Sequence, residues 1–221
     1  MISEKNKKVL ITDFDGTVIK KDFFWYIIEK LMTEEDALPW KDYQAGKITH
    51  FEALNRIFAK IHISEEELHK IILELPVEEC FPELVGFCNN NDIDIYIVSA
   101  GADYYINVIL DFLGIKNSVK LIANESTYSK KDGLQMVKLT EDSIFYSENY
   151  GIDKEAVMKF MKNRYELTVF AGDGTPDYNA ALWADVVFAR GTLLELCKQH
   201  NIDCIKLDSY CQIFDYLKKD Y

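Results

Sequence analysis

The sequence has few of the residues from which zinc sites and disulfide frameworks are built. Its four histidines are scattered, and its five cysteines, at positions 80, 88, 197, 204 and 211, include no Cys-x-x-Cys pair. Zinc sites usually need clustered His and Cys ligands, so this pattern argues against one. The odd cysteine count favours reduced thiols, and with them a cytoplasmic location, over a framework of disulfides.

Positive charge and long apolar segments are also scarce. Lys and Arg total 25 against 37 for Asp and Glu, which gives a formal net charge of −12. Nucleic acid and anionic membranes are therefore poor partners, because both need a basic surface. The longest apolar run near the N-terminus spans only 23–28, whereas a membrane-spanning helix needs about 20 apolar residues. Residues 1–8 also lack the apolar core of a signal peptide.

The chain does have enough apolar material for a full core. Its 221 residues are 48% apolar, which suits one α/β core with an insertion and argues against disorder. Strands are predicted at 8–12, 95–98, 119–123, 167–171 and 186–188, with a possible sixth at 204–207. Helices are predicted between and after them at 81–91, 102–113, 153–161, from Pro176, 193–200 and 213–217. This alternation predicts a doubly wound parallel sheet with right-handed crossovers.

Two segments depart from the alternation. Residues 21–76 are helical in pattern, with three or four helices and a capping-box spacing from Ser64 to Glu67. Because this block directly follows the first strand, it predicts an inserted helical cap on a core formed by 1–20 and 77–221. Asp-Gly at 132–133, between two extended runs, predicts a hairpin near 124–140.

Polar side chains follow the predicted strands where each strand ends. The first strand runs into Asp13 and Asp15, the second into Ser99, and the fourth into Asp173, with Asp177 one helical turn later. Ligands of open α/β sheets bind at the carboxyl ends of the strands, so these groups should share one crevice. Two carboxylates about 4 Å apart repel by roughly 4 kcal/mol at an effective dielectric of 20. Mg²⁺ reverses that sign, and carboxylates with a substrate phosphate are its preferred ligands.

This set of motifs resembles the haloacid dehalogenase (HAD) superfamily of Mg²⁺-dependent phosphatases. The matching segments are Asp13-Phe-Asp15-Gly-Thr17-Val, Val98-Ser99, and Gly172-Asp173-Gly-Thr-Pro-Asp177, in the family's order and across nearly the whole chain. The resemblance implies a HAD-like α/β fold with a small helical cap. It also implies hydrolysis of a small phosphorylated metabolite through an aspartyl-phosphate intermediate, by a monomer or a homodimer.

The resemblance further implies a role for each acid. Asp13 attacks phosphorus, while Asp15 protonates the leaving oxygen and then deprotonates the hydrolytic water. Asp13, the main-chain carbonyl of Asp15 and Asp173 hold Mg²⁺, and Asp177 supports them either as a further ligand or by holding one of the ligands. A carboxylate is a competent nucleophile once the phosphoryl group is polarised by a metal.

A phosphate clamp is implied as well, made of Ser99, the backbone near Ala100 and a lysine. The family places this lysine at the start of the helix before the fourth strand, which favours Lys154. Lys138 and Lys130, in or beside the predicted hairpin, are the alternatives. A lysine in the first turn of a helix lies near the positive end of the helix dipole. That unfavourable position argues for a functional reason at 154.

The insertion resembles the small cap of the phosphoserine-phosphatase-like branch. Within this branch the sequence resembles the methionine-salvage phosphatases that act on a phosphorylated 2-hydroxy-3-keto enol. The resemblance rests on Asp22, Arg56, the hairpin and Phe188-Ala-Arg190. Phosphoserine phosphatases carry Glu where Asp22 stands and a cap Arg that Arg56 matches. The shorter Asp weakens recognition of serine, and Arg56 is equally well a surface residue on an amphipathic helix.

Several alternatives stay open. A phosphoserine phosphatase or a phosphotransferase of the same superfamily uses the same motifs. A phosphoryl-accepting signalling module also has acids at strand ends, but it needs only about half this length and no helical insertion. The aromatic run 23–26 suits core packing better than a substrate pocket, and Tyr104 and Tyr105 either contact substrate or pack their helix.

Overall fold

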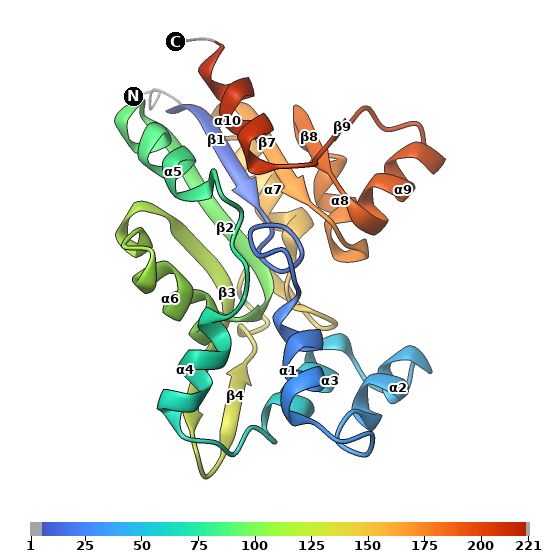
Figure 1. Cartoon of the computed structure of the whole chain (residues 1–221). Helices are drawn as coiled ribbons and strands as arrows, with labels where there is room; N and C mark the ends of the chain where they lie inside the picture. Colours follow the sequence, from blue (N-terminus) through green and yellow to red (C-terminus); the bar gives the residue numbers. More distant parts are fainter. Residues whose placement is uncertain (1–5, 220–221) are drawn as a thin grey trace.

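A computed structural model describes residues 6–219, and a seven-stranded sheet runs through its centre in the order β4-β3-β2-β1-β7-β8-β9 (Figure 1). The strands are β1 (Asn6–Thr12), β2 (Ile93–Ala102), β3 (Lys120–Ser129), β4 (Gly133–Val137), β7 (Tyr165–Gly172), β8 (Val186–Ala189) and β9 (Ile205–Lys206). Neighbouring strands are parallel except β3 and β4, which form an antiparallel hairpin. The predicted parallel sheet is confirmed, and the hairpin turns at the predicted Asp-Gly.

The order of the strands reverses at β1. In the sheet, β1 pairs with β2 on one side and with β7 on the other, so that Leu10 lies between Ile95 and Val169. The crossovers on the two sides of β1 therefore run in opposite directions. A crevice opens at such a switch point, beyond the carboxyl ends of the strands.

Helices cover both faces of the sheet, because successive strand side chains point to opposite faces. One face packs on α5 (Phe81–Asn90), α6 (Asp103–Phe112) and α10 (Tyr210–Lys218), and the other on α7 (Lys154–Lys162), α8 (Tyr178–Ala181) and α9 (Gly191–Gln199). Asp153 caps α7 as predicted, accepting from the Ala156 N–H at 3.0 Å. Within 6–219 no helix has the length and apolar character needed to cross a membrane.

Small elements complete this part of the chain. Strands β5 (Tyr146–Ser147) and β6 (Gly151–Ile152) form a two-stranded ribbon that no sequence pattern indicated. The 3₁₀ segment η1 (Lys116–Ser118) leads into β3, and η2 (Thr175–Asp177) precedes α8. Pro176 therefore lies in a 3₁₀ turn rather than opening an α-helix, since the chain must first bend at Gly174 to bring Asp177 back toward β7.

Between β1 and α5, the segment predicted to be a cap contains four helices: α1 (Phe23–Leu31), α2 (Leu38–Gln44), α3 (His50–Phe58) and α4 (Glu65–Leu73). Figure 1 shows α1, α2 and α3 as a lobe that follows the end of β1. The predicted capping box of Ser64 and Glu67 opens α4. Helix α4 lies against α6, where the Tyr104 hydroxyl donates to Glu65 at 2.8 Å.

One pair of cysteines shows that the expectation of reduced thiols is wrong in part. Cys80, the N-cap of α5, forms a disulfide with Cys211 in the first turn of α10. The two residues are 131 positions apart, and the packing of α5 against α10 brings their Cα atoms to 5.2 Å. Cysteine spacing carries no trace of such a contact. Cys88, Cys197 and Cys204 are free thiols, as expected.

Candidate active site

A cavity of about 160 Å³ lies where β1, β2 and β7 end and the first three helices after β1 begin. Most of the predicted site residues line it: Asp13, Asp15, Asp22, Ser99, Ala100, Lys154 and Asp173. Asp177 is fully buried beside them. Only Arg56, among the predicted residues, lies away from the cavity wall and its immediate contacts.

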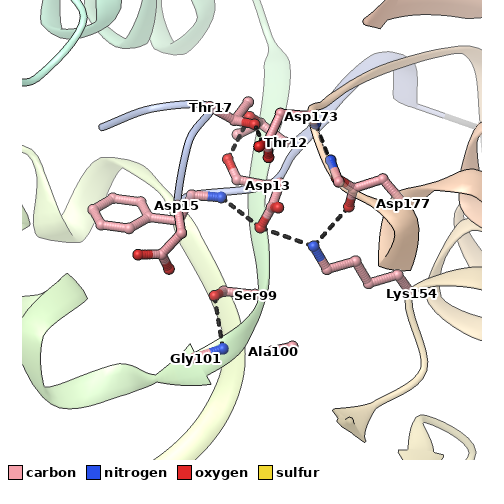
Figure 2. Close-up of polar contacts among 12 residues, drawn as sticks. Thr12, Asp13, Asp15, Thr17, Ser99, Ala100, Gly101, Lys154, Asp173 and Asp177 are labelled. Atoms are coloured by element: carbon pink, nitrogen blue, oxygen red, sulfur yellow. Dashed lines mark hydrogen bonds and ion pairs between the residues drawn. The ribbon is translucent and has the colours of Figure 1, made fainter. Parts of the chain in front are cut away.

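Lys154 joins two of the acids. Its Nζ lies 2.8 Å from Asp13 Oδ1 and 2.7 Å from Asp177 Oδ1, with only 4% of its side chain exposed (Figure 2). Burial lowers the pKa of Lys154, but the two carboxylates outweigh it and raise the pKa. Lys138 instead pairs with Glu148 at the surface. Of the proposed lysines, the fold therefore brings Lys154 to Asp13.

Three acids form a cluster that fits a divalent cation. Asp13, Asp173 and Asp177 each offer a carboxylate oxygen within 4.8 Å of the others. Burial and then repulsion by Asp177 raise the pKa of Asp13 well above its usual range, against the pull of Lys154. The same two causes raise the pKa of Asp173 to about 6. Oxygen ligands this close together, with their mutual repulsion only partly offset by Lys154, suit Mg²⁺.

The first motif packs directly on Asp173. A Cβ at Gly16 would lie 2.4 Å from Asp173 Oδ2, and Gly16 has a φ of +69°, so glycine is needed there for two reasons. The next residue, Thr17, donates its hydroxyl to Asp173 Oδ1 at 3.0 Å. The Gly-Thr pair after Asp15 therefore aligns the segment that carries Asp13 with the loop that carries Asp173.

Asp177 acts within the loop after β7. Its Oδ2 accepts from the N–H groups of Asp173 and Gly174 at 2.9 Å each, while Oδ1 accepts from Lys154. Both carboxylate oxygens thus have protein partners. Asp177 ties the loop that carries Asp173 to the lysine that reaches Asp13.

Asp15 faces away from this cluster (Figure 2). Its Oδ1 accepts from the Phe23 N–H at 2.9 Å, and its Oδ2 accepts from the Tyr105 hydroxyl. Burial and the nearby Asp22 raise the pKa of Asp15 to about 7, although both hydrogen bonds oppose the rise. A carboxyl that titrates near neutrality is suited to both giving and taking a proton. Tyr105, left open by the sequence, holds this carboxyl and stacks on the Phe23 ring at 4.1 Å.

Ser99 and Ala100 form the cavity wall at the end of β2. Ser99 is buried, and its Oγ accepts from the Gly101 N–H at 3.0 Å. The Ala100 carbonyl accepts from Asn124 Nδ2 at 2.8 Å, which anchors this end of β2 to β3. The predicted hydroxyl and backbone groups are thus held on the wall that also contains Asp13.

The two cap residues predicted for the site differ in position. Asp22 lines the cavity as the N-cap of α1, accepting from the Trp25 N–H at 3.3 Å, and burial raises its pKa to about 6. Arg56 has 54% of its side chain exposed, and its Nη2 lies 3.9 Å from Glu52. Of the two alternatives for Arg56, the structure therefore agrees with the surface residue on an amphipathic helix.

Sequence reasoning missed several cavity residues of the cap. Trp40 of α2 and His50 of α3 line the cavity, as do Phe24 and Trp25 of the aromatic run that was assigned to core packing. Phe24 also belongs to the core, with 5% of its surface exposed. No motif marks these positions, because they depend on how three short helices pack together.

Comparisons with known proteins relate the chain to phosphatases. A family model described as Putative Phosphatase matches residues 8–202. The 2-hydroxy-3-keto-5-methylthiopentenyl-1-phosphate phosphatase of Bacillus cereus (strain ATCC 10987 / NRS 248) is 25% identical over 209 residues, 93% of this chain and 94% of that protein. The protein of the same name from Lysinibacillus sphaericus (strain C3-41) is 25% identical over 219 residues, 91% of this chain and 93% of that protein.

Solved structures share the fold. A substrate-bound phosphoserine phosphatase complex superimposes with a TM-score of 0.66 at 21% identity, over 96% of this chain and 99% of that chain. A phospho-aspartyl intermediate analogue of phosphoserine phosphatase superimposes with a TM-score of 0.67 at 21% identity and the same coverage. The family model spans most of the residues that build the sheet and the site, so this chain belongs to the Putative Phosphatase family and is a phosphatase with the HAD fold.

Proposed function

We propose that this chain is a Mg²⁺-dependent phosphomonoesterase that hydrolyses a small phosphorylated metabolite through an aspartyl-phosphate on Asp13. The observation that carries the proposal is the grouping at the switch point of the sheet. There Asp13 lines a cavity, its carboxylate is held by Lys154, and carboxylate oxygens of Asp13, Asp173 and Asp177 lie close enough together to hold one cation.

The first half of the reaction transfers the phosphoryl group to the protein. A carboxylate oxygen of Asp13 attacks phosphorus as the bond from phosphorus to the ester oxygen breaks. Asp15, with a pKa of about 7, gives its proton to the leaving alcohol. In the second half, a water molecule attacks the phosphorus while Asp15 takes a proton from that water. The bond between phosphorus and Asp13 breaks, which releases inorganic phosphate and restores Asp13.

The surrounding groups bind the phosphoryl oxygens. We assign the Ser99 hydroxyl, the backbone near Ala100 and the Lys154 ammonium to this clamp, because all three lie on the cavity wall with Asp13. Asp13, the main-chain carbonyl of Asp15 and Asp173 would hold Mg²⁺, which supplies positive charge for the phosphoryl oxygens and offsets the repulsion between the acids. Asp177 supports this set by fixing the loop of Asp173.

The comparisons suggest two substrates. The relatives at 25% identity are named for a phosphorylated methylthio-pentenyl compound, and the shared fold is that of phosphoserine phosphatase. We favour the first class, because Arg56, which a phosphoserine enzyme would use in the cap, is on the surface. Phosphoserine hydrolysis and phosphoryl transfer to an alcohol are the second candidates. A cytoplasmic location and a monomeric or homodimeric state stay predictions.

Hydrolysis of p-nitrophenyl phosphate tests the proposal. We expect turnover with Mg²⁺, none with EDTA, and a loss of at least about 10³-fold in kcat for Asp13→Asn, which cannot act as a nucleophile at its amide. Asp142→Asn is the matched control, because Asp142 is exposed and does not line the cavity. Full activity of Asp13→Asn, or no activity of the wild type on a broad panel of phosphate esters, would refute the assignment.

A further inference from the structure

The cavity has two chemically different ends. The sheet end contains Asp13, Asp173 and Lys154, whereas the cap end is lined by apolar and aromatic side chains from the first three helices. Among the described residues that line the cavity, Lys154 is the only lysine or arginine, and it is committed to Asp13 and Asp177. The cap end therefore has no cation for a substrate carboxylate.

The one charged residue at the cap end has a structural partner. Asp22 caps α1 by accepting from the Trp25 N–H at 3.3 Å. His50 does not add a positive charge near neutral pH, because burial, helped by Lys154, lowers its pKa to about 4. A zwitterionic leaving group would bury its carboxylate here without a partner, which is strongly unfavourable.

Two ring nitrogens at this end are buried without a partner. Within residues 6–219, Trp40 Nε1 and His50 Nδ1 make no hydrogen bond. More than about nine-tenths of buried polar groups in native proteins are paired, and an orphan costs about 1–3 kcal/mol. An oxygen atom of a bound leaving group would accept from Trp40 Nε1, while His50 Nδ1 donates or accepts according to its tautomer.

The rings that carry these nitrogens are held in place. Trp40 packs on Phe24 with ring centroids 4.6 Å apart and meets His50 edge-on at 5.8 Å. His50 packs on Tyr150 at 5.2 Å, and its main-chain N–H donates to Asn149 Oδ1 at 3.0 Å, which fastens the start of α3 to the core. Fixed rings do not lose rotamer freedom on binding, so they are suited to selecting a ligand.

We infer that Trp40 and His50 determine specificity, and that they select an uncharged leaving group that combines apolar surface with an oxygen acceptor. The apolar part packs between Phe24, Leu54 and Phe58, and the oxygen meets the unpaired nitrogens. The inference rests on the proposed phosphomonoesterase function and adds the class of ester that enters the cavity.

Four esters that differ only in the leaving group test the inference. The probes are 2-oxohexyl phosphate, hexyl phosphate, phospho-L-serine and phosphoethanolamine, each with Mg²⁺. We expect kcat/KM to be highest for the keto ester, about 5- to 10-fold lower for hexyl phosphate, which lacks the acceptor, and at least about 10²-fold lower for the two charged esters.

Two variants then assign the preference to residues. Trp40→Phe and His50→Phe keep an aromatic ring but remove the nitrogen, so each should lower kcat/KM about fivefold more for the keto ester than for hexyl phosphate. Trp183→Phe is the matched control, because Trp183 is partly exposed near α7 and donates to Glu155. Circular dichroism and thermal unfolding would be used to check that each variant is folded.

The outcomes separate this inference from the proposed function. The inference would be overturned if the protein hydrolysed p-nitrophenyl phosphate but had a kcat/KM for phospho-L-serine or phosphoethanolamine that equalled or exceeded its kcat/KM for 2-oxohexyl phosphate. The proposed phosphatase function would still hold in that case. An equal loss on all four esters in both variants would also overturn it, since that result indicates a structural role. No turnover of any ester, p-nitrophenyl phosphate included, would overturn the proposed function and the inference with it.

Discussion

At the sheet end of the cavity the carboxylates of Asp13, Asp15 and Asp177 are already held by hydrogen bonds, whereas at the cap end the nitrogens of Trp40 and His50 have no partner within residues 6–219. The sheet end is organised before substrate arrives, which is what transition-state stabilisation requires. The cap end is completed by the leaving group. The contrast indicates that reaction chemistry and substrate choice are built from separate parts of the chain.

Breaking the sheet end should have the larger effect. Lys154→Met leaves Asp13 and Asp177 buried without their cation, which should cost about 3–5 kcal/mol in the free energy of unfolding of the metal-free protein. We also expect kcat/KM to fall about 10²- to 10³-fold, because the proposed contact between the Lys154 ammonium and the substrate phosphate is lost. Urea unfolding in EDTA and steady-state kinetics measure the two effects.

The matched control for this variant is Arg56→Met, which removes an exposed cation of the cap. We expect its kcat/KM to stay within about twofold, since exposed ion pairs contribute at most about 1 kcal/mol. If Lys154→Met stayed within threefold of the wild type (about 0.7 kcal/mol in the barrier), the phosphate clamp would need another cation.

Tyr105 links the two ends of the cavity, because its hydroxyl contacts Asp15 and its ring stacks on Phe23 of α1. Removing the hydroxyl should lower kcat less than removing Lys154 does, but it should also change the pH dependence of kcat. Tyr105→Phe keeps the stack on Phe23 and removes the hydrogen bond to Asp15. That hydrogen bond lowers the pKa of Asp15, so its loss raises the pKa further. We expect the pH optimum of kcat to move to higher pH and kcat to fall about tenfold at neutral pH.

The pH profile of kcat for Tyr105→Phe, measured beside Tyr104→Phe, checks this prediction. Tyr104 is the neighbouring tyrosine of α6, but its hydroxyl contacts Glu65 and His69 rather than Asp15. Identical profiles for the two variants would show that the hydroxyl of Tyr105 has no bearing on proton transfer.

The smallest effect should come from His50, through stability. Burial lowers its pKa from 6.5 to about 4, so the folded chain favours the neutral ring. Between those two pH values the unfolded chain binds a proton that the folded chain does not, so the free energy of unfolding falls as pH falls. In His50→Phe this contribution is absent, and stability should fall less steeply over the same window.

Urea unfolding at pH 6.5 and at about pH 5 measures the difference in slope. His200→Phe, at the exposed end of α9, is the control and should follow the wild type. A slope for His50→Phe that equals the wild-type slope would show that His50 is not held neutral by burial.

The residues of the sheet end could be predicted because backbone geometry determines where they lie. Asp13 and Asp173 directly follow β1 and β7, Ser99 lies near the end of β2, and parallel strands end at the same edge of a sheet. Lys154 was placed with them through the resemblance, which puts a lysine at the start of the helix before β7, where Lys154 opens α7 next to its capping residue Asp153. Short-range pattern was enough for the strand-end residues, whereas the resemblance to the HAD superfamily supplied the choice of Lys154 and the role of each residue.

The cap end could not be predicted in the same way. The pattern of 21–76 indicated helices, and helices formed, but the side chains that line the cavity depend on the angles at which α1, α2 and α3 pack. Trp40 and His50 were missed for this reason, and Arg56 turned out to face solvent. The ring of Phe24 serves both the core and the cavity, which periodicity alone cannot distinguish.

The sequence by itself determined the parallel sheet, the helical insertion and the strand-end positions of Asp13, Asp15 and Asp173, because local hydrophobic pattern and strand polarity are properties of short segments. Only the tertiary structure decided the contact of Tyr105 with Asp15, the bond between Cys80 and Cys211, and the composition of the cap end. These contacts join residues that are far apart along the chain. Their geometry follows from how helices pack on the sheet and on one another, which no short segment encodes.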